Sequence, residues 1–175
     1  MTLRDDVVIL DVKVRLIQEA DLPALEWGGE YSHFRYLYRE IFENSVRKEA
    51  VLWVADHKNA GLVGQLFVQL ISKRKKLADG SLRAYFFGFR IQSLYRGMGV
   101  GTALLNMAEQ DLLNRGYRWA ILNVNRENTL AQRFYRRSGY RIVSAETGRW
   151  SYIDNTGQRR LVNEPAWRMM KKLSQ

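Results

Sequence analysis

Apolar and polar positions along the 175-residue chain predict a mixed α/β protein. Short apolar runs predict strands at residues 12–16, 51–55, 62–71, 83–92, 119–124 and 140–143. The run 83–92 is apolar on both faces, which is typical of a strand in the middle of a sheet. We expect a last hairpin made of residues 149–153 and 166–173, with its turn at 155–157.

Between these runs, apolar residues recur with helical spacing. We expect a short helix capped by Asp21, with Pro23 in its first turn, and a longer helix over residues 31–47. A third helix runs from Val100 to about Arg115 and is followed by a glycine. A fourth helix, over residues 129–138, is capped by Asn128.

The stretch Tyr95-Arg96-Gly97-Met98-Gly99-Val100-Gly101-Thr102 lies between the apolar strand 83–92 and the third helix. A strand, a glycine-rich turn and a helix start bring backbone N–H groups close to an anion, so we predict a phosphate-binding turn. The Walker pattern is absent, and the dinucleotide pattern is missed because Gly101 comes one residue early. The alternative is a tight turn that needs glycine only for its backbone conformation.

Charge is distributed unevenly along the sequence. The net charge is +10, and residues 1–50 hold 7 Lys/Arg and 10 Asp/Glu, so the remainder carries +13. A basic body suits a polyphosphate ligand or nucleic acid. No helix-turn-helix, zinc or stacking motif accompanies the charge, so nucleic acid is the least favoured partner. The chain lacks cysteine, and we expect a cytoplasmic protein without a membrane span or signal peptide.

Two sequence blocks resemble one known family. Arg96, Gly99 and Gly101 form an Arg-x-x-Gly-x-Gly pattern that resembles the pyrophosphate loop of the GNAT N-acetyltransferase superfamily. A second block resembles the family pattern Asn-x-x-Ala-x-x-Phe-Tyr-x-x-x-Gly-Phe through Asn128, Ala131, Phe134, Tyr135 and Gly139, with Tyr140 in place of phenylalanine.

The resemblance implies a single GNAT domain over residues 1–175: a mixed, mostly antiparallel central sheet, flanked by helices, with splayed central strands. It implies an N-acetyltransferase that uses acetyl-CoA. The predicted cofactor contacts are Arg96, Gly97, Met98, Gly99, Val100, Gly101, Thr102, Asn128 and backbone groups around Phe89 and Ile91. The resemblance also implies that Tyr135 is the general acid for the departing thiolate. The alternative is that Tyr135 is a buried aromatic residue of the core.

We assign no general base. The strand 83–92 has no carboxylate, and the next strand presents Asn123, whose amide cannot act as a base. Glu40 and Glu43 are remote candidates that are better explained as solvated helix residues, and His33 and His57 have no spacing for a metal site.

The resemblance implies that the acceptor is a primary amine of a small molecule or a peptide, and its identity stays open. Aromatic residues at the spacing found in residues 31–47 are mostly core, but the resemblance makes Tyr31, Tyr36 and Tyr38 candidate acceptor contacts. Glu26, Glu30, Glu40 and Glu43 suggest a cationic acceptor, or they balance nearby arginines. A domain that binds acyl-CoA without turnover is the alternative function. Also open are a longer acyl donor and a homodimer.

Overall fold

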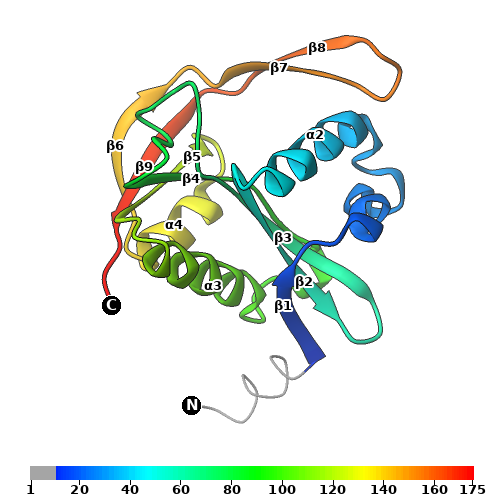
Figure 1. Ribbon diagram of the computed structural model, residues 1–175, viewed down its shortest axis with the longest axis horizontal. Helices are drawn as coiled ribbons and strands as arrows, with labels where there is room; N and C mark the ends of the chain where they lie inside the picture. The colour runs from blue at the N-terminus through cyan, green and yellow to red at the C-terminus, as the bar shows by residue number, and fades with distance from the viewer. Residues whose placement is uncertain (1–10) are drawn as a thin grey trace.

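The computed structural model describes residues 11–175, which fold around a seven-stranded sheet (Figure 1). Its strands lie in the order β1-β2-β3-β4-β5-β9-β6. Their bounds are β1 Val12–Leu16, β2 Ala50–His57, β3 Gly61–Gln69, β4 Arg83–Ile91, β5 Trp119–Asn125, β6 Arg141–Glu146 and β9 Ala166–Lys172.

The pairing of these strands confirms the mixed, mostly antiparallel sheet. Only β4 and β5 are parallel, and every other neighbouring pair in this sheet is antiparallel. The parallel pairing joins Arg83–Phe86 to Trp119–Leu122 and then stops, although β4 continues to Ile91 and β5 to Asn125. The two central strands therefore separate over their second halves, as the sequence resemblance implied.

Helices cover both faces of the sheet (Figure 1). Two of them, α3 and α4, lie on one face, and α2 lies on the other. The helical segments are η1 Glu19–Gly29, η2 Ser32–Phe34, α2 Arg35–Val46, η3 Ser93–Tyr95, α3 Val100–Asn114 and α4 Thr129–Arg137, where η marks a 3₁₀ helix. Of these, none is both long and apolar enough to cross a membrane.

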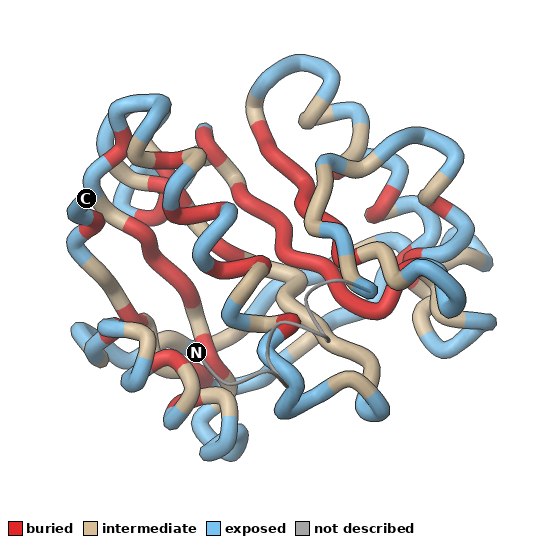
Figure 2. The backbone as a smooth tube through the Cα atoms, turned by 90° about the horizontal axis from the view of Figure 1, so that it is seen from below, coloured by how far each residue is buried: buried red, intermediate tan, exposed pale blue. Residues whose placement is uncertain are grey.

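The sheet separates two hydrophobic cores. Along β2, Trp53 packs into the core beneath α3, whereas Leu52 and Val54 pack into the core beneath α2. Successive side chains of a strand point to opposite faces, so β2 is buried on both sides. Figure 2 shows this as continuous buried strands inside a largely exposed outer layer.

The predicted last hairpin is wrong. β7 (Arg149–Ile153) pairs with β8 (Arg159–Asn163) as a separate ribbon, and β9 enters the main sheet between β5 and β6. The turn at 155–157 is right, but it joins β7 to β8. The sequence gives no signal for β8 because this strand buries no apolar face. Leu161, in the middle of β8, is 83% exposed.

The predicted cap at Asp21 is also wrong. The first 3₁₀ helix begins at Glu19, and Asp21 lies in its first turn, where its carboxylate accepts the Gln18 N–H at 2.7 Å. Both Asp21 oxygens also bind the Arg15 guanidinium, at 2.8 and 2.9 Å. This bidentate bond lowers the pKa of Asp21. The carboxylate thus joins the first strand to the segment that follows it.

Candidate functional site

The glycine-rich loop forms an open surface at the start of α3. Gly97 and Gly99 have φ of 73° and 87°, where other residues are strained, and a Cβ added to either would meet nothing within 4 Å. The Ala103 N–H bonds to Gly99 O at 3.0 Å, so the amides of residues 100–102 precede this first turn of α3. Open space, free donors and the positive end of the helix fit a pyrophosphate group.

Gly101 has a different role from the two glycines before it. It lies inside α3, where a Cβ would stand 3.6 Å from Phe134 Cζ and 3.7 Å from Phe89 Cζ. The loop, α4 and β4 thus meet at this point. Arg96 folds back onto β4, because its Nε donates to Ile91 O at 3.0 Å. We interpret this side chain as a brace that holds the loop against the strand.

The backbone of β4 next to the loop faces the gap between the central strands. Gln92 N–H bonds to Val63 O at 2.8 Å across the β3–β4 pair. Backbone groups alternate in direction along an antiparallel strand, so Ile91 directs its N–H away from β3 and toward β5; its C=O points the same way and accepts the bond from Arg96. This is the orientation that a cofactor contact by Ile91 requires.

Asn128 is the N-cap of α4, as predicted. Its side-chain oxygen accepts the Ala131 N–H at 3.1 Å. The residue is exposed, and its amide nitrogen is available to a ligand. Its contact with the cofactor stays a prediction.

Tyr135 is a buried side chain beside the gap between the central strands. Its ring lies 6.1 Å from the ring of Phe89 and 5.9 Å from the ring of Tyr140. Burial, with a smaller effect from the neighbouring Tyr85, raises the pKa of the Tyr135 hydroxyl. Among residues 11–175 this hydroxyl has no hydrogen-bond partner. The structure therefore combines a core ring with an unused, protonated donor.

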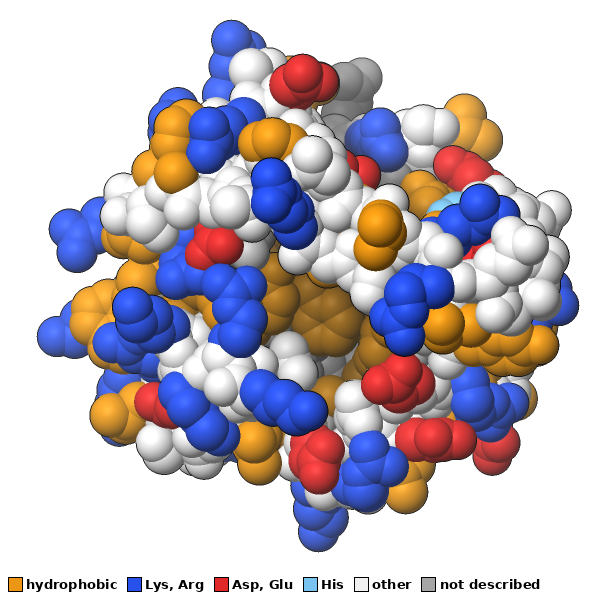
Figure 3. All heavy atoms as spheres, turned by 90° about the horizontal axis from the view of Figure 1, so that it is seen from above, with side chains coloured by type: hydrophobic (Ala, Val, Ile, Leu, Met, Phe, Trp, Pro, Cys, Tyr) orange, Lys and Arg blue, Asp and Glu red, His pale blue; other side chains and the backbone are white. Residues whose placement is uncertain are grey.

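A cavity of about 780 Å³ lies on the face of the sheet that α2 covers, opposite to α3 and α4 (Figure 3). Its apolar floor and walls come from β4, α2 and the β7–β8 ribbon, with arginines and carboxylates around the mouth. Phe34, Tyr38, Tyr85, Phe87, Arg90 and Trp150 are among its lining residues. Asn123 and Asn125 from β5 line it too, so the cavity reaches the gap between the strands.

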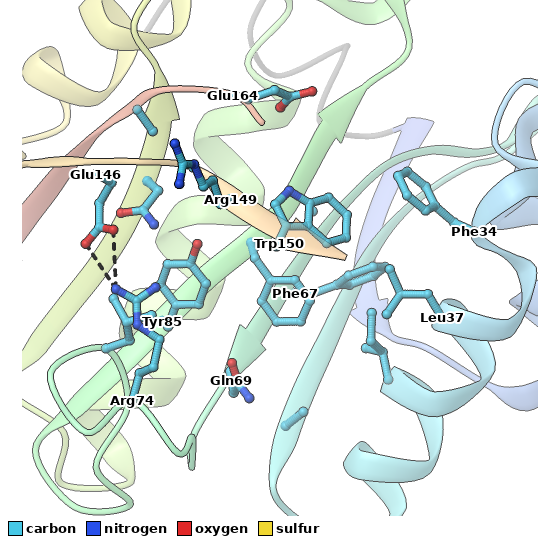
Figure 4. A pocket seen from close by; sticks show the side chains of 18 of the residues that line it. Phe34, Leu37, Phe67, Gln69, Arg74, Tyr85, Glu146, Arg149, Trp150 and Glu164 are labelled. Carbon is cyan, nitrogen blue, oxygen red and sulfur yellow. Dashed lines mark hydrogen bonds and ion pairs between the residues drawn. The ribbon is translucent and has the colours of Figure 1, made fainter. Parts of the chain in front are cut away.

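One end of the cavity is polar (Figure 4). Glu146 binds Arg74 at 3.2 Å and also pairs with Arg168. Next to this group are Tyr85 and Asn123, and burial raises the pKa of Tyr85. Within residues 11–175, the buried Oδ1 of Asn123 and Nε of Arg168 have no hydrogen-bond partner.

Sequence reasoning missed most of this polar end. From the sequence, the run Lys73-Arg74-Lys75-Lys76 before the Asp79-Gly80 turn signal is predicted to be a solvated loop, and all four of its residues are exposed. This exposure agrees with a solvated loop, but the Arg74 guanidinium also binds Glu146, 72 residues away along the chain, and lines the cavity. No local pattern connects two such distant residues.

The three tyrosines predicted as acceptor contacts occupy different positions in the structure. Tyr38 lines the cavity, Tyr31 packs against Arg90, and Tyr36 is exposed. Of the four glutamates that suggested a cationic acceptor, only Glu40 is a cavity residue. Glu26 forms an ion pair with Arg35 at 2.7 Å. These positions give little support to an acidic path for the acceptor.

The two histidines have structural positions. His57 Nδ1 accepts the N–H groups of Asn59 and Ala60, both at 3.1 Å, and His33 packs between Phe34 and Tyr152. In the described part of the chain, no group of histidine and carboxylate side chains could hold a metal ion.

Comparison with known proteins gives a family and a fold. The model of the acetyltransferase (GNAT) family matches residues 16–140. A search of the curated proteins found no match.

Several solved structures share the fold. Ard1 from Thermoplasma volcanium has a TM-score of 0.72 at 16% identity and covers 94% of this chain and 99% of its own. The ribosomal-protein-S18-alanine N-acetyltransferase of Escherichia coli has a TM-score of 0.69 at 17% identity, and the match covers 94% of this chain and 95% of that protein. Arabidopsis thaliana NAA60 in complex with acetyl-CoA has a TM-score of 0.65 at 23% identity, and the match covers 93% of this chain and 98% of that protein.

Proposed function

The chain belongs to the acetyltransferase (GNAT) family, whose acyl donor is acetyl-CoA, and from this premise we propose that it transfers an acetyl group directly to a primary amine. One observation carries the proposal. The open glycine loop and the cavity lie on opposite faces of the sheet, and they meet where β4 and β5 stop pairing after Phe86 and Leu122. A donor held by the loop and an acceptor held in the cavity would have their reacting atoms at this gap.

The amides of the loop, residues 97–102, would hold the pyrophosphate of acetyl-CoA. Backbone groups around Phe89 and Ile91 would bind the pantetheine arm and the acyl carbonyl, and Asn128 would contact the same arm. When bound, acetyl-CoA supplies an acetyl group activated as a thioester.

In the proposed step, Tyr135 is the general acid. The new C–N bond forms as the C–S bond breaks, the sulfur takes the Tyr135 proton, and the amine loses one proton to solvent. Tyr135 then takes a proton back from solvent, which completes the cycle. The support is the position of Tyr135 beside the gap and its unused hydroxyl. The raised pKa keeps the hydroxyl protonated even at the alkaline pH at which more of the amine is neutral and able to react.

Thermal unfolding with ligands tests the donor site. At a concentration of about 100 times Kd, acetyl-CoA or coenzyme A should raise Tm by about 5–10 °C, and NAD or ATP should raise it less. Gly99→Val should abolish the shift by placing a side chain where the phosphate binds. A shift with NAD and none with acetyl-CoA would contradict the proposal.

The chain offers a matched control for this variant. Gly157, in the β7–β8 turn, has φ of 85° and, like Gly99, has nothing within 4 Å of an added Cβ. Gly157→Val should therefore impose the same backbone strain and leave the acetyl-CoA shift intact.

Release of free coenzyme A in the presence of amine acceptors tests turnover. Acetyl-CoA binding without turnover of any acceptor would favour the alternative, an acyl-CoA-binding sensor. A panel of amino acids, peptides and polyamines covers the acceptor classes that the sequence leaves open.

A further inference from the structure

Arg90 is a cation of the cavity wall that its neighbours hold in one position. Its Nη1 donates to the Tyr38 hydroxyl at 2.8 Å. The guanidinium carbon lies 4.2 Å from the centre of the Tyr31 ring and 5.2 Å from that of Phe34. The side chain is half-buried and lines the cavity. These contacts restrict its rotamers before any ligand arrives.

The charge of Arg90 has no counter-charge in residues 11–175. None of the ion pairs formed by these residues includes Arg90. Of the carboxylates that line the cavity, Glu146 already binds two other arginines, and Glu40 and Glu164 are exposed. Tyr38 does not neutralise Arg90 either, because burial raises the pKa of its hydroxyl and keeps it protonated.

The unused donors of Arg90 are suited to a carboxylate. A guanidinium has five N–H groups in a planar fork, and only one bonds to Tyr38. The rings of Tyr31 and Phe34 attract the cation but accept few of its hydrogen bonds. A carboxylate accepts two parallel N–H bonds from such a fork. An anion in the cavity would satisfy both the charge and the donors.

Arg90 lies in the part of β4 that borders the gap between the central strands, where the amine is proposed to react. Arg90 follows Phe89 directly in β4. Under the proposed function, backbone groups around Phe89 bind the acyl carbonyl. Gln65, the partner of Arg90 in β3, donates to Gly88 O at 3.1 Å and fixes the same part of the strand. An anion held by Arg90 is therefore close to the proposed reaction point.

We propose that Arg90 binds a carboxylate of the acceptor, so that the substrates are amines with a nearby carboxylate. This inference rests on the proposed acetyltransferase function and names its substrate class. Such a carboxylate comes either from a free amino acid or from an acidic side chain near the N-terminus of a peptide. Polyamines, which carry only positive charge near the amine, are poor acceptors.

Matched acceptor pairs test this proposal. One arm compares L-amino acids with their α-carboxamides, and the other compares peptides with Asp or Glu at the second position with peptides that have Asn or Gln there. The wild-type protein should have a higher kcat/KM for the carboxylate member in one of the arms. Arg90→Gln should lower that value by about 10- to 100-fold, the range for hydrogen bonds to charged groups, and leave the amide member unchanged.

Two control variants distinguish a binding role from a structural one. Arg39→Gln removes the same charge from an exposed position on α2, where Arg39 pairs with Glu19, and it should leave the carboxylate preference intact. Arg90→Lys keeps the charge but loses the fork, and it should restore part of the preference. An acetyl-CoA shift in Tm that persists in Arg90→Gln shows that this variant folds.

The outcomes separate this inference from the function on which it rests. Equal kcat/KM for the acids and amides in both arms, or a carboxylate preference that survives Arg90→Gln, would overturn the role of Arg90 and leave the acetyltransferase standing. So would turnover of polyamines in preference to every carboxylate acceptor. Absence of both the acetyl-CoA shift and turnover would overturn the two proposals together.

Discussion

Two buried tyrosines, Tyr135 and Tyr140, lie side by side but differ in what their hydroxyls contact. Tyr140 donates to Glu109 at 2.8 Å, and Glu109 also binds Lys171 at 2.8 Å. Tyr140 thus has a structural reason to replace the phenylalanine of the family pattern. Tyr135 has no such partner in residues 11–175, which leaves its proton available.

We predict that Tyr135→Phe lowers kcat by about 10²–10⁴, the range for general acid–base catalysis, and preserves the acetyl-CoA shift in Tm. The ring is retained, so the packing against Phe89 should persist. Steady-state kinetics and thermal unfolding measure the two effects. A wild-type kcat in this variant would show that Tyr135 is only a core residue.

Tyr140→Phe is the control for that experiment. It also removes one buried hydroxyl, but it breaks the bond to Glu109. It should lower the free energy of unfolding by about 1–2 kcal/mol with kcat unchanged.

At the level of elements, the loop between β3 and β4 brings Arg74 to the cavity, and Asp79 holds this loop in shape. Asp79 Oδ1 accepts the backbone N–H groups of Ser81, Leu82 and Arg83 at 3.0, 2.8 and 2.9 Å. Burial by itself would raise the pKa of Asp79, but these bonds outweigh it and lower the pKa to about 2.

This lowered pKa predicts a pH dependence of stability. The unfolded chain binds the proton more tightly, so the contribution of ionised Asp79 is complete above its ordinary pKa of 3.8. That contribution should decrease as the pH falls from about 4 to about 2. Asp79→Asn should therefore be less stable than wild type at pH 6, and the difference should shrink toward pH 2. Urea unfolding across this range measures it, and a constant difference would contradict the assigned pKa.

The molecule as a whole has a charge of +10, with −3 on residues 1–50 and +13 on the remainder. This field should attract coenzyme A and, under the Arg90 proposal, an anionic acceptor. A cationic acceptor would be repelled, and the cavity offers it only Glu40 from the four glutamates first considered.

We predict that Kd for coenzyme A rises several-fold between about 0.05 and 0.5 M salt, because the screening length shortens over this range. Dephospho-coenzyme A lacks the 3′-phosphate and should show a smaller slope. Titration calorimetry measures both ligands. No salt dependence for either ligand would mean that the +10 charge has no role in donor binding, and equal slopes would mean that the 3′-phosphate does not contribute to this attraction.

The sequence by itself determined the features that depend on near neighbours in the chain. Gly97 and Gly99 adopt the positive φ that the loop pattern predicts, and α3 and α4 begin where expected. Helix caps, glycine turns and apolar periodicity act within a few residues, so the chain displays them locally. The same local blocks carry the family resemblance, and with it the predicted splay of β4 and β5.

Only the tertiary structure decided the composition of the cavity. Arg74, Arg90 and Glu146 are far apart in the chain, and strand pairing and loop packing bring them to one cavity. Long-range pairing also placed β9 inside the main sheet and gave the exposed strand β8 its partner. The sequence shows the charge of an arginine, but whether a carboxylate compensates that charge depends on residues that only the fold makes its neighbours. For this reason the glycine loop was predictable from the sequence, and the uncompensated charge of Arg90 in the cavity was not.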